Sequence, residues 1–353
     1  MQQAMNPQPA IASKWQPPRT HVFAVGLLEY DDGVHWSLEM RRDTVLMDAL
    51  RDRGVAADAI TFLRDAEATT RGFEGAFVER VQAARPGEQL LVYYAGHGGR
   101  DREHGGGYFK LRDGRLPTSQ LFAWIERYYR GELAILTADC CYSGCLTLDA
   151  PLRAGRVAYA AIGSSLSTLP STGAWTFTNC WIDAIRGHIP VDLDGDGILR
   201  LDELARYAER RLCFHDGQVS SFAVANGMPS TFVLGPARRR PHPRHGELVE
   251  ARRDGKWVKA ELLDVRDSGA MAVRWLADPA DVDVEPADVR PWQPRDLTPG
   301  TAVEVEYKKR WYDADVLAAR NGMHFVRYTG WDRSWDEWVP SYRLRRADGD
   351  AIT

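Results

Sequence analysis

The chain has 353 residues, of which 44% are hydrophobic, so it is long enough for two or three domains with at least one sizeable core. Lys and Arg number 45 against 49 Asp and Glu, and the net charge of -4 gives no electrostatic argument for binding nucleic acid. No long apolar stretch and no secretory signal pattern are present, which predicts a cytoplasmic protein without a membrane partner. Five cysteines, two of them adjacent, suit neither a disulfide framework nor a zinc site.

Residues 1–20 are expected to be flexible, and from residue 21 to 236 apolar runs alternate with segments of helical spacing. The predicted strands are 21–28, 59–65, 88–98, 132–141 and 156–165, and the predicted helices are 38–54, 69–87, 118–131, 173–187 and 200–212. Buried strands that alternate with amphipathic helices indicate a mostly parallel sheet with helices on both faces. In such a sheet, ligand sites lie beyond the C-terminal ends of the strands.

Two of the predicted strands deliver reactive side chains at this edge. The segment QLLVYYAGHGG ends with His97, and LTADCCYSG ends with the pair Cys140 and Cys141. Side chains alternate across a strand, so Cys140 and Cys141 should face opposite sides, while Asp139 and Cys141 share one side. Only one sulfur can therefore face a cleft, and the alternation does not say which.

The motifs YYAGHGG and ADCCYSG resemble the His-Gly and Asp-Cys-Cys-His-Ser-Gly motifs of caspase-like cysteine peptidases, most closely prokaryotic caspase homologues and metacaspases. The resemblance covers about residues 21–236 and implies a caspase-like α/β sandwich. It implies that Cys141 is the nucleophile, that His97 is its acid–base partner, and that the backbone amides of Gly98 and Cys141 form the oxyanion hole. Tyr142 stands where metacaspases often have His, a departure that removes no catalytic group. The alternatives are a Cys/His pair that only fills a core and an inactive scaffold whose tail binds a partner.

Asp139 predicts the substrate preference. A carboxylate beside the nucleophile disfavours the thiolate, unless a cation such as a substrate Arg or Lys side chain offsets it. The resemblance implies that Asp139 and Asp43 line a pocket for the basic residue before the scissile bond. We therefore expect an endopeptidase that cleaves proteins or peptides after Arg or Lys, with self-processing at Arg153, Arg156 or the arginines of 238–240. The alternatives are a strand-end cap for Asp139 and an exposed helix acid for Asp43.

A calcium site is predicted in DLDGDGILRLDE (192–203), which has the spacing of an EF-hand loop before a clear exiting helix. The expected ligands are Asp192, Asp194, Asp196, the carbonyl of Ile198, and Glu203. The alternative is a tight turn in which the aspartates cap the helix.

The C-terminal part repeats once after an Arg/Pro linker (237–245). GELVEARRDGKWVKAELLDV from Gly246 aligns with GTAVEVEYKKRWYDADVLAA from Gly300, a period of roughly 54 residues. Short strands rich in Trp, Val and Tyr predict two small β-barrels, at 246–293 and 298–346, followed by a tail at 347–353.

The second repeat contains FVRYTGWDRSWDEWVPSYRL (325–344), which resembles the Tudor and chromo-barrel families. In the methyl-lysine readers of these families, aromatic rings form a cage for a quaternary ammonium group. The resemblance implies such a cage, for a protein partner, at Tyr312, Tyr328, Trp331 and Trp335. The alternative is that these rings pack a small barrel core. The first repeat lacks these aromatics and is expected to be a spacer or docking module.

Overall fold

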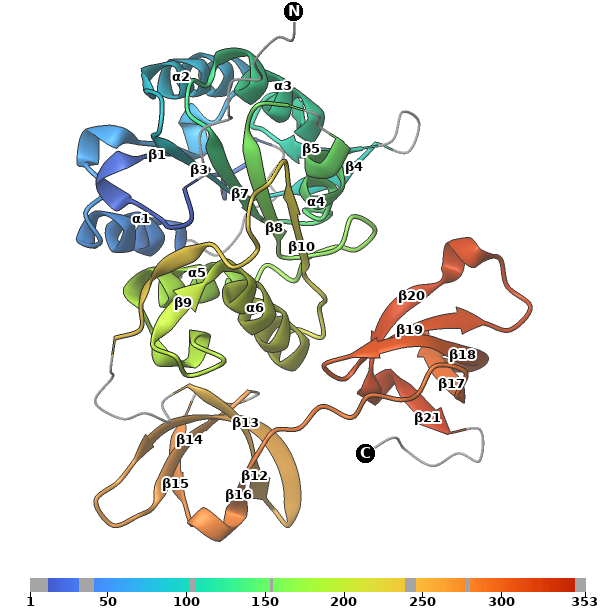
Figure 1. Cartoon of the computed structure of the whole chain (residues 1–353). Helices are drawn as coiled ribbons and strands as arrows, with labels where there is room; N and C mark the ends of the chain where they lie inside the picture. The colour runs from blue at the N-terminus through green and yellow to red at the C-terminus, as the bar shows by residue number, and fades with distance from the viewer. Residues whose placement is uncertain are drawn as a thin grey trace, which may run out of the picture.

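The computed structural model describes residues 12–31, 41–101, 106–152, 155–238, 246–276, 278 and 280–346. An α/β domain is followed by two small β domains, each built around its own sheet (Figure 1). Within the described residues, no helix is long and apolar enough to cross a membrane.

The α/β domain is built on a six-stranded sheet of order β10-β8-β7-β3-β1-β2, in which every neighbouring pair is parallel except β10 with β8. These strands are β1 (Thr20–Gly26), β2 (Ile60–Arg64), β3 (Gln89–Ala95), β7 (Leu133–Asp139), β8 (Ala158–Gly163) and β10 (Ser221–Ala225). Every residue of β3, β7 and β8 is buried, which is why these strands read as continuous apolar runs rather than as alternating ones.

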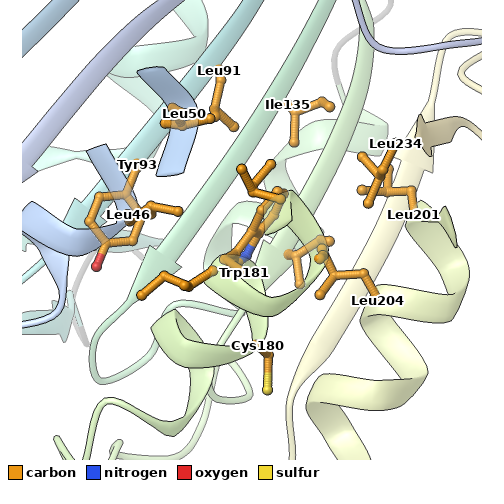
Figure 2. Packing of buried hydrophobic residues seen from close by; sticks show 14 of the residues in the cluster. Leu46, Leu50, Leu91, Tyr93, Ile135, Cys180, Trp181, Leu201, Leu204 and Leu234 are labelled. Atoms are coloured by element: carbon orange, nitrogen blue, oxygen red, sulfur yellow. The ribbon is translucent and has the colours of Figure 1, made fainter. Parts of the chain in front are cut away.

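Helices cover both faces of this sheet. One face packs against α1 (Asp43–Asp52), α5 (Thr176–Arg186) and α6 (Leu201–His215), and the other against α2 (Thr70–Ala83), α3 (Thr118–Tyr128) and α4 (Cys145–Asp149). Figure 2 shows the first core, where Trp181 of α5 lies between side chains of β3, β7 and α6. The predicted α/β sandwich, a mostly parallel sheet with helices on both faces, is confirmed.

Several short elements were not expected from the sequence. A three-stranded antiparallel sheet follows His97, and a separate strand pair flanks α6; these strands are β4 (Gly98–Arg100), β5 (Gly107–Lys110), β6 (Arg115–Pro117), β9 (Ile198–Arg200) and β11 (Val233–Pro236). Short 3-10 helices lie at Pro17–Arg19, Ala57–Ala59, Asp65–Glu67, Ala150–Leu152, Ile189–Val191, Pro286–Asp288, Arg333–Trp335 and Ser341–Arg343. Elements of three or four residues are too short to show a hydrophobic period.

The segment before β1 packs on the domain. Trp15 is buried, its indole Nε1 donates to Oγ1 of Thr20 at 3.0 Å, and its backbone N–H donates to the carbonyl of Val233 at 2.7 Å. The expectation that 1–20 is flexible is therefore wrong for residues 12–19, because an apolar anchor fixes them; residues 1–11 lie outside the described residues.

The two C-terminal barrels have the same strand order, β15-β14-β13-β12-β16 and β20-β19-β18-β17-β21. Their strands are β12 (Glu247–Arg253), β13 (Lys256–Val265), β14 (Met271–Trp275), β15 (Asp281–Val284), β16 (Val289–Pro291), β17 (Ala302–Tyr307), β18 (Arg310–Arg320), β19 (Met323–Tyr328), β20 (Glu337–Pro340) and β21 (Leu344–Arg346). The registers also match, since Ala260 faces Trp275 in the first barrel and Ala314 faces Tyr328 in the second. The predicted repeat of two all-β units is confirmed.

The first barrel docks on α6. The guanidinium of Arg211 pairs with the carboxylate of Glu261, and Nζ of Lys259 donates to the carbonyl of Phe214 at 3.0 Å. This barrel thus has a defined contact with the α/β domain.

The second barrel also docks on the C-terminal half of this helix. Nδ2 of Asn321 donates to Glu209 at 3.0 Å, and Met323 is buried with Cys213 and Val219 in a small apolar cluster. Leu166 and Trp338 pack against this cluster. Leu166 belongs to the loop after β8, so the barrel contacts a segment that leads toward the edge of the sheet where His97 and Cys141 lie.

Candidate active site

The parallel pairing of β3 and β7 brings His97 and Cys141 to the same edge of the sheet. Ala95 lies opposite Asp139 in the register, and each reactive residue follows two positions later. Both His97 and Cys141 line one cavity of about 780 Å³. The structure therefore brings the two predicted catalytic residues to a common space that is large enough for substrate side chains.

The backbone of Gly98 lies directly against that of Cys141. A Cβ atom placed on Gly98 would lie 2.1 Å from the carbonyl oxygen of Cys141 and 2.8 Å from Sγ of Cys140. No side chain fits at this distance, so glycine is required here by close approach of two backbones. The two residues predicted to form an oxyanion hole are thus neighbours in space.

The two adjacent cysteines face opposite sides, as alternation requires. Cys140 is 1% exposed and packs in the core under α2, α3 and α4, and burial raises the pKa of its thiol well above the usual value. Cys141 is partly exposed and lines the cavity. Of these two sulfurs, that of Cys141 therefore opens onto the cavity, whereas that of Cys140 is deeply buried.

A serine-rich loop after β8 holds the Cys141 turn. The backbone N–H of Ser171 donates to Sγ of Cys141 at 3.2 Å, and the backbone N–H of Tyr142 donates to the carbonyl of Leu169 at 2.9 Å. Tyr142 itself has a positive φ of 58°, a strained conformation for a bulky residue, which this clamp maintains. Leu169 and Ser171 belong to the run STLPS (167–171), which follows β8, the strand next to β7.

Buried serines fix the same turn from below. The N–H of Ser143 donates to Oγ of Ser165 at 3.2 Å, and the N–H of Ser165 donates back to Oγ of Ser143 at 3.0 Å. The N–H of Cys140 donates to Oγ of Ser164 at 3.1 Å. The backbone that carries the nucleophile is thus held by side chains of the adjacent strand end.

His97 is oriented by tyrosines that the sequence pattern did not single out. Its backbone N–H donates to the hydroxyl of Tyr30 at 2.7 Å, and the two rings lie 4.7 Å apart between centroids. The hydroxyl of Tyr94 lies 2.8 Å from the carbonyl oxygen of His97. These contacts restrict the position of the imidazole before any substrate binds.

Asp139 lies on the same side of β7 as Cys141 but beneath the cavity. It is 3% exposed, and its Oδ2 accepts from Oγ1 of Thr178 at 2.7 Å and from the N–H of Thr178 at 3.2 Å. Burial raises its pKa to about 6, although the hydrogen bonds from Thr178 act in the opposite direction. Thr178 lies in the first turn of α5. These contacts therefore match the alternative in which Asp139 is a strand-end cap.

Asp43 is fully buried at the start of α1, so the alternative of an exposed helix acid is wrong. Nη2 of Arg41 lies 2.6 Å from its Oδ2, and Nη1 of Arg41 lies 2.5 Å from Asp65. Arg41 also donates to the carbonyl of Gly26 at 2.7 Å. The carboxylate of Asp43 is thus neutralised inside the chain, and its predicted role in substrate binding remains a prediction. Its neighbour Arg42, not Asp43, lines the cavity.

The first barrel contributes to the wall of the cavity. Gly246, Glu261 and Leu263 line it together with residues of the α/β domain. Burial alone would raise the pKa of Glu261, but the pairing with His215, at 3.2 Å, and with Arg211 holds it at about 2. Arg211 and Glu261 of this charged cluster both line the cavity.

The aspartates of the predicted calcium loop gather as expected. One carboxylate oxygen from each of Asp192, Asp194 and Asp196 lies within 4.8 Å of the others, which is a donor set that suits a hard cation such as calcium. Nη2 of Arg200 lies 2.5 Å from Asp196, so this side chain now supplies positive charge.

The remaining expected ligands are used differently. Glu203 is buried and accepts from the backbone N–H groups of Leu193 at 2.8 Å and Arg200 at 2.9 Å. The carbonyl of Ile198 lies 3.4 Å from Nη1 of Arg200. Glu203 therefore caps α6 and the loop in this structure, whereas the turn alternative gave the capping to the aspartates.

The four aromatic residues of the predicted cage gather in the second barrel. The ring centroids of Trp331 and Trp335 lie 5.0 Å apart, those of Tyr328 and Trp331 5.4 Å apart, and those of Tyr312 and Trp331 5.2 Å apart. Trp331 and Trp335 are exposed, but Tyr328 is 3% exposed and belongs to the barrel core. The hydroxyl of Tyr328 donates to Glu337 at 2.6 Å, which holds this ring in the barrel, as the alternative of core packing describes.

The α/β part thus places a histidine and a cysteine at the ends of adjacent parallel strands, and the chain continues into two small barrels. Residues 297–346 match the family model described as "Tudor-knot: RNA binding activity-knot of a chromodomain", which confirms the resemblance predicted for the second barrel. No curated protein matches the chain.

Among solved structures, the chain is similar to protein GSU0716 from Geobacter sulfurreducens, with 17% identity, coverage of 64% of this chain and 98% of that one, and a TM-score of 0.45. It is also similar to caspase-1 from Spodoptera frugiperda, with 14% identity, coverage of 68% and 96%, and a TM-score of 0.40. AGDP1 AGD34 from Arabidopsis thaliana matches with 18% identity, coverage of 29% and 80%, and a TM-score of 0.15.

We predict that Gly98→Ala lowers the free energy of unfolding by about 1–3 kcal/mol, because the added methyl group forces the His97 and Cys141 turns apart. Urea unfolding measures this difference. Gly75→Ala is the matched control, since nothing lies within 4 Å of its new Cβ inside α2; it should stabilise by about 0.5–1 kcal/mol. Equal effects of the two substitutions would contradict the close contact.

We predict that Asp139 makes the protein less stable as pH rises from about 4 to 6. Its folded-state pKa of about 6 lies above the unfolded value of 3.8, so the folded state binds the proton more tightly across this window. The stabilisation present below the window, about 3 kcal/mol, is lost above it. Urea unfolding of wild type and Asp139→Asn across this range tests the sign, because the difference should move in favour of the variant as pH rises. A constant difference would mean that Asp139 is not buried as described.

Proposed function

We propose that the chain is a cysteine endopeptidase in which Cys141 is the nucleophile and His97 the acid–base residue. The observation that carries the proposal is the shared cavity. Adjacent parallel strands place the imidazole of His97 and the thiol of Cys141 on the same space. Both types of residue are needed at such a site, because a thiol must be deprotonated and a leaving amine must be protonated.

The chemistry follows from the positions of these groups. His97 accepts the thiol proton, and the thiolate of Cys141 attacks the carbonyl carbon of the scissile peptide, so that a C–S bond forms and the carbonyl oxygen becomes negative. The N–H groups of Gly98 and Cys141 would hold this oxygen, and His97 returns the proton to the leaving amine as the C–N bond breaks. Water then hydrolyses the thioester. The N–H of Ser171, which donates to Sγ, stabilises the thiolate before substrate arrives.

The proposed preference is for Arg or Lys before the scissile bond. Asp139 supports it, since it lies on the cavity side of β7 and no cation of the chain is bonded to it among its described contacts with Thr178 and Ser164. Arg41 already neutralises Asp43, so Asp139 is the carboxylate that a substrate cation would neutralise. A second candidate, cleavage after an acidic residue, is favoured by Arg42, whose side chain lines the cavity and is held by Asn179 at 2.7 Å.

We expect Cys141→Ala and His97→Ala each to lower peptide cleavage by roughly a thousandfold or more, because each removes a group that takes part in bond making. Fluorogenic peptides measure the rate. Cys140→Ala is the matched control, since this sulfur is buried on the other side of the strand, and it should retain most of the activity. Activity that survives in Cys141→Ala but is lost in Cys140→Ala would reverse the assignment. Inactivity of the wild type towards all peptides would favour a non-catalytic scaffold.

We compare two peptides that differ only in having Arg or Asp before the cleaved bond. We expect kcat/KM to be much higher for the Arg peptide. Asp139→Asn should lower kcat/KM for the Arg peptide by more than about tenfold, because the partner charge is lost. Arg42→Gln should leave the Arg peptide as the better substrate. Faster cleavage of the Asp peptide, abolished by Arg42→Gln, would establish the second candidate instead.

Calcium dependence is part of the proposal. A cation bound by Asp192, Asp194 and Asp196 would displace Arg200 from Asp196 and stabilise the start of α6, the helix on which both barrels dock. We expect millimolar calcium to raise Tm, since binding to the folded loop alone shifts the folding equilibrium. Asp194→Asn should abolish the shift, and Asp267→Asn, outside this loop, should retain it. An equal rise in Tm with calcium in both variants would mean that the aspartates form only a turn and do not bind the cation.

Self-processing is also proposed, with a restricted choice of sites. The guanidinium of Arg156 donates to the carbonyls of Tyr129 and Gly131, which withholds this residue from an active site. Arg153, Arg239 and Arg240 lie outside the described residues. Arg238 is held by its backbone N–H on the carbonyl of Gly187 at 2.7 Å, so cleavage in the linker would first require this contact to open.

A further inference from the structure

A second cavity joins the active-site turns to the aromatic face of the second barrel. It measures about 1270 Å³, larger than the cavity at Cys141. One side consists of the strand after His97 and the turn after Cys141, including Gly98, Gly99 and Tyr142. The other side consists of the aromatic residues of the barrel, including Tyr328, Trp331 and Trp335.

The two cavities adjoin the same backbone turns. His97 and Cys141 line the first cavity, while their immediate neighbours Gly98 and Tyr142 line the second. Leu169, whose carbonyl accepts the N–H of Tyr142, also lines the second cavity. A polypeptide bound at Cys141 can therefore continue past these turns toward the barrel.

The barrel face of this groove has open tryptophan rings. Elsewhere in the described part of the tail, Arg side chains of the chain itself cover the large rings, such as Arg345 over Trp311 at 4.3 Å and Arg320 over Trp338 at 5.0 Å. No such internal cation covers Trp331 or Trp335 among the described residues, although Trp335 is 47% exposed. These rings remain able to accept a cation from outside.

The charged groups that line the groove include both signs. Carboxylates of Asp101, Asp336 and Glu337 line it, against the guanidinium groups of Arg100 and Arg333. Asp336 and Glu337 are paired with Arg327 and Arg343, so they orient the wall and do not attract a ligand strongly. The attraction for a ligand therefore comes from the aromatic surface itself, and exposed tryptophan rings suit a lysine-type side chain.

We propose that this groove binds the substrate polypeptide itself, with a lysine-type cation of the substrate on Trp331 and Trp335 while the scissile bond lies at Cys141. The inference rests on the proposed peptidase function. It makes the second barrel part of the substrate site, so that a second cationic residue, at a fixed distance along the chain from the cleaved bond, contributes to recognition.

The test uses the full-length enzyme and long quenched-fluorescence peptides with one cleavable Arg in a neutral background. A single Lys is moved stepwise on either side of that Arg, and each peptide has a partner with norleucine in place of Lys. At one spacing, KM for the Lys peptide should be about tenfold below that for the norleucine peptide. The ratio of the two KM values is measured, so that changes common to both peptides cancel.

Trp335→Ala should bring this ratio to about one, and Trp335→Phe should restore part of it, because an aromatic ring returns. Tyr342→Ala is the matched control, since Tyr342 is a 77% exposed aromatic of the same barrel that does not line the groove. It should keep the wild-type ratio. Thermal unfolding of each variant checks that the barrel remains folded.

Cleavage of all long peptides with equal KM for Lys and norleucine at every spacing would overturn the groove while leaving the peptidase. Absence of cleavage with any peptide, short or long, would overturn the proposed function and the groove's role as a substrate site with it. A single-stranded RNA whose binding is weakened by Trp335→Ala, combined with equal KM values for the peptides, would assign the groove to nucleic acid and also overturn the proposal.

Discussion

The in-register parallel pairing of β3 with β7 determines the rest of the site. Because Ala95 lies opposite Asp139, the chain leaves both strands at the same level, and His97 and Cys141 emerge side by side. The backbones then approach so closely that Gly98 admits no side chain. Every other polar feature at this edge, from the serine loop to the tyrosines, adjusts the orientation of groups whose separation the sheet has already set.

Burial decides which polar groups can act. Asp139 is the last residue of β7, and Cys140 follows it directly. Desolvation makes ionisation unfavourable for both side chains. Thr178 compensates Asp139 with two hydrogen bonds, whereas the thiol of Cys140 is left in an apolar core. The partly exposed sulfur of Cys141 escapes this penalty and gains an N–H donor. Adjacent residues of similar type thus acquire different chemistry from the alternation of one strand.

The sheet, both reactive strand ends and the repeated barrels could be predicted because each depends on a local pattern, an apolar run or a motif that ends it. The ion pair of Asp43 could not be predicted, because Arg41 contacts both Asp43 and Asp65 only when the start of α1 is packed against β1. Tyr328 was assigned to a cage by resemblance, and a resemblance does not give the depth of a ring in the barrel. Glu261 was missed because its place in the cavity depends on how a distant barrel docks on α6.

The position of Glu261 bears on how such a chain can change during evolution. Composition divides the protein into an α/β unit and an appended tail, and the Arg/Pro linker looks like a point for recombination. Yet a wall of the cavity comes from beyond that point, and its charge is balanced by Arg211 and His215 from before it. Exchanging the tail for an unrelated module would leave the partly buried Arg211 without this counter-charge. The two halves are therefore expected to be inherited together, as a single unit of selection.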